Sequence, residues 1–491
     1  MNPNQSMSRF SRTLLGSALV IASASASAAT IVIQSRDPAG VGFNDTTPVA
    51  PVGGNTGTTL GEQRLNVYRF VADLWAAELD SAVPITVSAG WEALSCTAST
   101  ATLGSAGAWN AWFNFPGAPQ TGTWYGQALA NKLAGVNLSA DNPDDGTGYG
   151  NVDIKTQFNV NLGKADCLAG APFYLGLDGA AGSLIDFSVV LLHELGHGLG
   201  FQTFTSGRTG AQLAGLPSAW DRFILDNTTG KNWVEMTATE RALSGVNGRH
   251  LVWTGANVAA AVPMVLALGT PAMTISSPSN IAGSYSVGPA NFGPALNAAG
   301  GISGFVGRVL DQPNGTGLAC DPLSAANAKA VAGRVAMVDR GVCSFAVKVK
   351  NVQDAGATAV LVVDNAAGSP PAGLGASGTA IDALITIPSV RISIDDGNII
   401  KSVLASVSRR NPNPSVSVVL GVDPLLRAGA DSMGRAMLYS PNPYINGSSI
   451  SHYDTLASPN QLMEPNINSD LTKSVRPPKD MTKALLKDIG W

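Results

Sequence analysis

Two histidines four residues apart, with a glutamate directly after the first, are the side chains of this sequence best suited to chemistry. His193, Glu194 and His197 form the pattern His-Glu-x-x-His. On a helix, residues i and i+4 share one face, so both imidazoles can face one cation while the glutamate beside them acts as a general base. The sequence has 4 histidines in all, and this pentapeptide holds two of them. The pattern predicts a zinc site of the hydrolytic kind.

The segment 184–200 must carry this pattern, and its apolar composition predicts a buried helix. Imidazoles inside such a helix need polar partners. Ser183, followed by Asp186, is the expected N-cap. Asp186 could instead accept a hydrogen bond from a ligand imidazole, although capping its own helix is the simpler role. Gly200 suits a left-handed turn at the end of the helix.

A catalytic zinc takes three protein ligands and keeps a fourth position open, so a third ligand must come from elsewhere in the chain. If it is a histidine, the candidates are His250 and His452. If it is a carboxylate, Glu235 and Glu240 are the candidates. The neighbours of His250 give no further sign of a metal site, whereas His452 is followed by Met463 in the segment LMEP.

The run HELGHGLGF, followed much later by His452 and Met463, resembles the metzincin zinc proteases. The split arrangement most resembles the leishmanolysin type, in which H-E-x-x-H-x-x-G-F is separated by a long insertion from a third histidine and a methionine turn. The closing residues DIGW are similar to the last helix of secreted metzincins. Thr203 stands where the extended metzincin pattern has its third histidine, and the long gap before His452 is the main departure.

This resemblance implies an α+β fold whose metzincin-like catalytic domain combines a twisted sheet with an active-site helix. It assigns one catalytic zinc ion to His193, His197 and His452, which we favour over His250, and it makes Glu194 the general base.

Two further residues near the third ligand have roles that follow from this comparison. Met463 would support the site from below without binding the metal. Tyr453 could donate a hydrogen bond to the developing oxyanion, although packing is the commoner role for such a tyrosine.

The middle of the chain is expected to be a separate inserted unit. The motifs DRGVCSF at 339–345 and DAGA at 354–357 resemble the protease-associated (PA) domain, a non-catalytic module that contacts substrates or gates access. Alternating strand and helix patterns predict an α/β unit there, and it contains no histidine. The expected elements are strands at 334–339, 359–364, 385–393 and 415–422 and a helix at 345–355.

The chain therefore divides into four expected segments. They are an export signal at 1–28, a catalytic domain in two parts at 29–256 and 425–491, and the inserted PA-like domain at 257–424. Within the catalytic parts we expect strands at 30–36, 84–89 and 152–160, a helix of about five turns that follows the capping box at Thr59, and a short helix at 481–489. The strand at 152–160 is the expected edge strand beside which a substrate peptide lies.

The N-terminal residues have the pattern of a secretory signal. Arg9 and Arg12 precede the apolar run Leu14–Ala22, and Ala26-Ser27-Ala28 has the form of a cleavage site. The four cysteines fit an oxidising compartment, and their positions favour the pairs Cys96–Cys167 and Cys320–Cys343. No other segment is apolar and long enough to span a membrane. We therefore expect a secreted protein without a membrane span.

Charge and composition exclude other classes of function. The 30 basic and 34 acidic residues give a formal net charge of −4, and no basic cluster stands out, so we expect no nucleic-acid partner. A loop with Asp141, Asp144 and Asp145 offers the oxygen ligands that calcium takes, but it lacks a calcium-loop spacing. Calcium is thus conceivable but unsupported, and we assign no metal to this loop.

Together these features predict a secreted zinc endopeptidase that acts on protein or peptide substrates. One alternative is a non-catalytic binding or adhesion protein that keeps a structural metal. Another is a zinc hydrolase whose substrate is not a protein. The sequence indicates neither the cleavage preference nor the oligomeric state.

Overall fold

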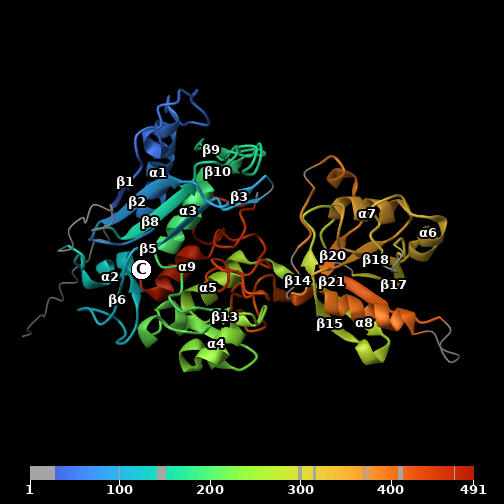
Figure 1. Cartoon of the computed structure of the whole chain (residues 1–491). Helices are drawn as coiled ribbons and strands as arrows, with labels where there is room; N and C mark the ends of the chain where they lie inside the picture. Colours follow the sequence, from blue (N-terminus) through green and yellow to red (C-terminus); the bar gives the residue numbers. More distant parts are fainter. Residues whose placement is uncertain are drawn as a thin grey trace, which may run out of the picture.

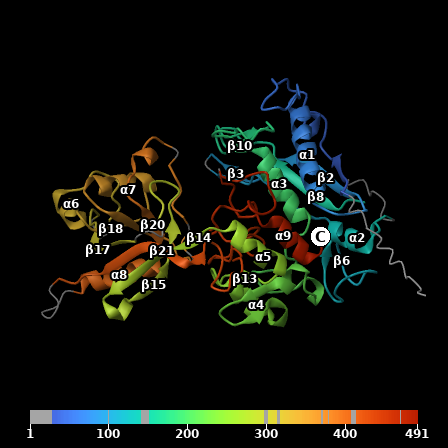
Figure 2. The same ribbon diagram turned by 180° about the vertical axis from the view of Figure 1, so that it is seen from behind.

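The computed structural model describes residues 28–98, 100–140, 151–296, 301–312, 317–368, 371, 373–377, 379–406, 413–468 and 470–491. The expected export signal up to Ser27 and the acidic loop with Asp141, Asp144 and Asp145 lie outside the described residues. The chain forms two bodies side by side (Figures 1 and 2). The first has one continuous core built from both the N-terminal part and the C-terminal segment, and the second has core clusters of its own.

A four-stranded sheet packs against helix α3 (Phe187–Gly198) in the first body. Its strand order is β1 (Ile31–Ser35), β2 (Ile85–Glu92), β8 (Ile154–Asn159) and β5 (Gly104–Ala108). The first three strands are parallel, and β5 is antiparallel to β8. The expectation that the strand at 152–160 forms the edge was wrong, because β5 covers that side of it. The sequence GSAGA of β5 lacks the β-branched and aromatic residues that mark strands.

Two long helices pack beneath this sheet, and local sequence signals set both. Helix α1 (Leu60–Ala76) begins with the expected capping box, in which the Glu62 amide donates to Thr59 Oγ1 over 3.2 Å and the Thr59 amide donates to Glu62 Oε2 over 3.1 Å. Helix α3 (Phe187–Gly198) is buried along its whole length. The Trp75 indole donates to the Leu192 carbonyl over 3.1 Å, which ties α1 to α3.

Most of the remaining elements of the first body share one core with helix α3. Helix α5 (Ala256–Val265) packs against the C-terminal helix α9 (Thr482–Ile489), and both contribute to the same core. The second body thus begins at Leu268 rather than at the expected residue 257. The other elements here are α2 (Gln127–Ala134), α4 (Ala238–Ser244), β3 (Cys96–Thr97), β4 (Thr100–Ala101), β6 (Ala111–Trp112), β7 (Tyr125–Gly126), β9 (Phe173–Tyr174), β10 (Ile185–Asp186), β11 (Ile224–Asp226), β12 (Lys231–Asn232) and β13 (Leu251–Trp253).

The second body is an α/β unit, as the alternation of patterns predicts. Its eight-stranded sheet has the order β15-β14-β21-β17-β18-β19-β20-β16, and the run from β17 to β20 is parallel. Separate apolar clusters fill its two faces. The elements are β14 (Leu268–Ser277), β15 (Gly283–Ser286), β16 (Gly288–Pro289), β17 (Ile302–Arg308), α6 (Ala325–Val331), β18 (Val335–Asp339), α7 (Phe345–Asp354), β19 (Ala359–Val363), β20 (Ser389–Ile392), α8 (Ile394–Ala405) and β21 (Ser417–Arg427).

The disulfides confirm the expected pairing, with one bridge in each body. Cys96 is bonded to Cys167, and Cys320 is bonded to Cys343. Among the described helices, none has the length and apolar character needed to traverse a bilayer.

Candidate metal centre

Helix α3 carries the first two histidines, and its start differs from the sequence prediction. It begins at Phe187, and the Asp186 carboxylate accepts hydrogen bonds from the Ser188 amide over 2.9 Å and the Ser188 hydroxyl over 2.6 Å. Ser183 is therefore not the cap, because residues 185–186 pair as strand β10 with β9 and stay extended. Asp186 caps the helix rather than holding an imidazole.

Glycines on α3 let the helix approach its neighbours closely. A Cβ atom at Gly196 would lie 2.8 Å from Met463 Sδ, and one at Gly198 would lie 2.3 Å from Ile154 Cγ2. Gly200 has a φ of 123° and turns the chain away, as expected. Met463 is completely buried against the helix, so it packs beneath the histidines as the sequence suggests.

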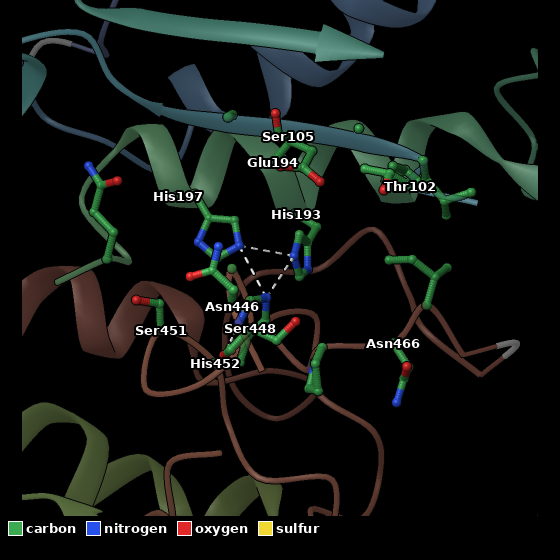
Figure 3. Close-up of a pocket in the computed structure, with 18 of the residues that line it drawn as sticks. Thr102, Ser105, His193, Glu194, His197, Asn446, Ser448, Ser451, His452 and Asn466 are labelled. Atoms are coloured by element: carbon green, nitrogen blue, oxygen red, sulfur yellow. Dashed lines mark hydrogen bonds between the residues drawn. The ribbon is translucent and has the colours of Figure 1, made fainter. Parts of the chain in front are cut away.

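Three imidazoles meet at one point on the floor of a cavity (Figure 3). The Nε2 atoms of His193 and His197 are 3.1 Å apart, those of His197 and His452 are 3.2 Å apart, and those of His193 and His452 are 3.3 Å apart. Nitrogen ligands of a tetrahedral zinc ion lie about 3.3 Å from one another, since each Zn–N bond is about 2.0–2.1 Å. The three side chains could therefore hold a metal ion.

Backbone carbonyl groups fix the tautomer of each ring. The Nδ1 atoms of His193, His197 and His452 lie 2.7, 2.8 and 2.7 Å from the carbonyl oxygens of Leu462, Phe201 and Ser448, respectively. A carbonyl oxygen can only accept, so each Nδ1 carries a hydrogen and donates it. The Nε2 lone pairs of the three neutral rings then point toward one another. A cation bound between them would relieve their electrostatic repulsion.

Burial keeps these rings neutral. It lowers the pKa of His193 to about 4. Burial, together with the neighbouring His193, lowers the pKa of His197 to about 3. Burial and both neighbours hold the pKa of His452 well below its ordinary value. Neutral imidazole is the form that binds metals, and its nitrogen donors suit zinc.

Glu194 faces the same cavity from helix α3 (Figure 3). Burial raises the pKa of its carboxyl group to about 8, and the backbone amide of Ala106 on the edge strand β5 partly offsets this effect. Glu194 thus lies beside three nitrogens that could hold a metal ion, and its carboxylate form is suited to accepting a proton.

The other candidates lie away from this centre. His250 is exposed, and among the residues that the structure describes it belongs to no group of three potential metal ligands. The carboxylates of Glu235 and Glu240 accept hydrogen bonds from the amides that precede their own helices. The role suggested for Tyr453 is wrong, because its hydroxyl is buried and donates to the Met481 carbonyl over 3.3 Å.

Sequence reasoning missed most of the cavity wall. The cavity measures about 620 Å³, and β5 with the loop before it forms one side while the loop that carries His452 forms the other. These segments lack a motif, so only the fold identifies them. The polar side chains that reach the wall are Thr102, Ser105, Gln202, Thr203, Asn446, Ser448, Ser451 and Asn466.

A second cavity of about 690 Å³ adjoins the first and shares Ala101, Leu103, Asn466 and Ile467 with it. It lies near the start of α3, and its lining mixes apolar side chains with polar ones such as Asp186 and Asn468. The large apolar side chains around it are Leu103, Leu168, Leu184, Ile185, Val189, Ile467 and Leu471.

Comparison with known proteins identifies the second body. Residues 306–400 match the PA domain family, so the chain contains a PA domain as the motifs indicate. The ER degradation-enhancing alpha-mannosidase-like protein 3 of Xenopus laevis is 35% identical over 119 residues, which are 23% of this chain and 12% of that protein. Its Homo sapiens counterpart is 40% identical over 82 residues, or 17% of this chain and 8% of that protein. The chain thus spans only a small part of these relatives.

Solved structures give likenesses that cover about a third of each chain. An aminopeptidase from Aneurinibacillus sp. strain AM-1 aligns at 20% identity with a TM-score of 0.23, over 32% of this chain and 31% of that one. BSAP, a zinc aminopeptidase from Bacillus subtilis, aligns at 17% identity with a TM-score of 0.22, over 34% and 36%. Likenesses this partial carry no conclusion about the metal centre.

Proposed function

We propose that this chain is a zinc-dependent endopeptidase of the metzincin class, with the split arrangement of the leishmanolysin type. The observation that carries the proposal is the convergence of three Nε2 lone pairs within 3.3 Å beside a buried glutamate at an open cavity. A structural zinc site is closed by four protein ligands, whereas this site brings three and leaves one position facing the cavity.

The chain's own groups then divide the chemistry. Bound at these nitrogens, zinc supplies the Lewis acidity that activates water and polarises a carbonyl group. Glu194 takes the proton of the attacking water on its carboxylate and later passes it to the leaving amine. The three carbonyl groups behind the imidazoles hold the rings in place throughout.

The cavity wall favours an extended peptide as the substrate. Strand β5 is the edge of its sheet and borders the cavity, so a peptide can pair with it through main-chain hydrogen bonds. Among the described residues that line the cavity, Glu194 is the one acidic side chain. An aminopeptidase would need a further carboxylate for the substrate ammonium group, so this wall favours internal cleavage.

The variant Glu194→Gln tests the mechanism directly. We expect it to bind zinc as the wild type does and to lose casein cleavage by about a hundredfold or more, because the proton acceptor is gone while the three nitrogens remain. Zinc content by metal analysis and turnover by a casein assay measure the two properties separately. Wild-type turnover in this variant would contradict the assignment of Glu194.

Peptides with a free or a blocked N-terminus separate endopeptidase from aminopeptidase activity. We expect equal cleavage of both. A zinc-loaded protein that cleaves neither casein nor peptides would instead support a binding protein with a structural metal or a hydrolase of another substrate.

We further propose that residues 1–28 direct export, which N-terminal sequencing of the secreted protein tests.

A further inference from the structure

The inserted body touches the first body where the third histidine is held. At the junction, one residue before the inserted body begins, the Ala267 amide donates to the Ser458 carbonyl over 2.6 Å. In the inserted body, Gly368 lies so close to the loop before His452 that a Cβ atom there would be 2.6 Å from the Asn442 carbonyl oxygen. Both contacts fall on the segment 437–463, which carries His452 and Met463.

A third contact is made by Arg249, a buried cation between the two bodies. Its Nη2 donates to the Val287 carbonyl of the inserted body over 3.2 Å. Its Nε lies 3.9 Å from Asp454 Oδ1, and the Asp454 side chain is completely buried. Arg249 adopts a φ of 64°, a conformation that a non-glycine residue seldom takes. The side chain therefore bridges the inserted body and a carboxylate two residues after His452.

Asp454 is built into the backbone that positions His452. Its amide donates to the Met437 carbonyl over 3.0 Å, and the Tyr439 amide donates to the His452 carbonyl over 2.9 Å. Its Oδ1 accepts from the Leu456 amide over 2.9 Å, whereas its Oδ2 has no hydrogen-bond partner among the described residues. Arg249 is the cation that forms an ion pair with this carboxylate, at 3.9 Å and without a direct hydrogen bond, and a buried carboxylate without such a partner is costly.

We propose that Arg249 is a positioning residue through which the inserted body holds the third metal ligand in place. The bridge joins the Val287 carbonyl to Asp454, and Asp454 fixes the strand-like segment that carries His452. This inference rests on the metal binding proposed above. It gives the inserted body a role in assembling the metal centre, in addition to any contact with substrates.

Amide hydrogen exchange of the wild-type protein with and without zinc tests the coupling. Linkage between two sites is reciprocal, so zinc binding should slow exchange in residues 283–290 of the inserted body as well as around His452. The variant Arg249→Met should bind zinc about tenfold more weakly, measured by competition with a chromophoric chelator, and should lose the zinc effect at 283–290. Arg249→Lys keeps the charge but not the two-sided reach, and it should also lose the effect at 283–290.

Lys329→Met serves as the matched control, because Lys329 is an exposed cation on α6 at the far end of the inserted body (Figures 1 and 2). It should behave as the wild type. If the wild type binds zinc and exchange at 283–290 does not change, the coupling is refuted while the metal centre stands. Wild-type zinc affinity in Arg249→Met also refutes it. If the wild type binds no zinc, the proposed function and this inference both fail. The wild-type comparison decides even if Arg249→Met does not fold.

Discussion

The candidate metal centre depends on backbone atoms that the residue types do not reveal. Each imidazole is oriented by a backbone carbonyl group, and two of these three groups belong to Ser448 and Leu462 in the C-terminal segment. Leu462 is itself held by Asp480, whose Oδ2 accepts from the Leu462 amide over 2.6 Å. The sequence therefore contains the three rings as recognisable histidines, whereas the groups that aim them appear only when the chain is folded.

The third ligand gives a prediction with an internal control. Replacing His452 by alanine should weaken zinc binding by more than about a hundredfold, because losing a ligand costs more than the 10–100-fold typical of losing a ligand's hydrogen-bond partner. Replacing His250 by alanine should leave zinc affinity unchanged, since that side chain is exposed and lies outside the cluster. Competition with a chromophoric chelator measures both. Equal affinities for the two variants would remove His452 from the site.

At the scale of elements, strongly patterned segments were predictable and the closely packed ones were not. The capping box before α1, the motif of α3 and the repeat of strand and helix around α7 all appear in local sequence. Strand β5 does not, because Gly104 is needed where a Cβ atom would lie 2.6 Å from the Phe158 ring. Small residues fit this close contact, but they leave the segment without the β-branched and aromatic residues that predict a strand.

The sequence assigned helix α5 to the inserted body for a similar reason. The apolar, alanine-rich run of α5 resembles the texture of the inserted body, yet it packs against α9. That contact joins segments more than two hundred residues apart, and no local pattern indicates it. The cavity wall was missed for the same reason, since Thr102 and Asn466 come together only through the fold.

Asp153 joins two elements and predicts a pH effect. Its carboxylate accepts from the Thr86 amide of β2 over 2.7 Å and from Asn131 Nδ2 of α2 over 2.8 Å. Burial raises its pKa from 3.8 to about 6. The folded state then binds a proton that the unfolded state has released, so the free energy of unfolding increases as the pH falls from above 6 toward 3.8.

The variant Asp153→Asn should lack this gain. The free energy of unfolding of the wild type minus that of the variant should increase by about 1.4 kcal/mol as the pH falls from 7.5 to 5. Urea denaturation at each pH measures both free energies. The buried histidines change the free energy of unfolding with pH in the opposite direction, but they do so equally in both proteins. Subtracting the two values therefore removes their contribution. A difference that does not change with pH, or that decreases at pH 5, would contradict the role of Asp153.

At the scale of the whole molecule, the insertion separates ligands in sequence without separating them in space. Strands β14 and β21 pair with each other, with Leu268 opposite Arg427, and the Ala428 amide donates to the Ala267 carbonyl over 3.0 Å. The chain thus leaves and re-enters the first body at one place, as a tolerated insertion requires. Each body has its own core and its own disulfide.

This organisation predicts that zinc stabilises one body globally and the other only at their contact. All 9 tryptophans lie in the first body, so their fluorescence reports its unfolding alone. At a free zinc concentration a thousand times the dissociation constant, the first body should gain about 4 kcal/mol against unfolding, because the folded state alone assembles the three nitrogens. Tryptophan fluorescence should then show a higher melting temperature with zinc than with a chelator. The same comparison in His452→Ala should show a much smaller shift, since an affinity at least a hundredfold lower leaves a gain of about 1.4 kcal/mol or less. The core of the inserted body contributes no ligand to the proposed zinc site, so zinc should not change its unfolding transition. Amide hydrogen exchange in β18 and β19 measures that transition. A zinc shift of wild-type size in His452→Ala would mean that the metal stabilises the molecule from somewhere other than these three histidines.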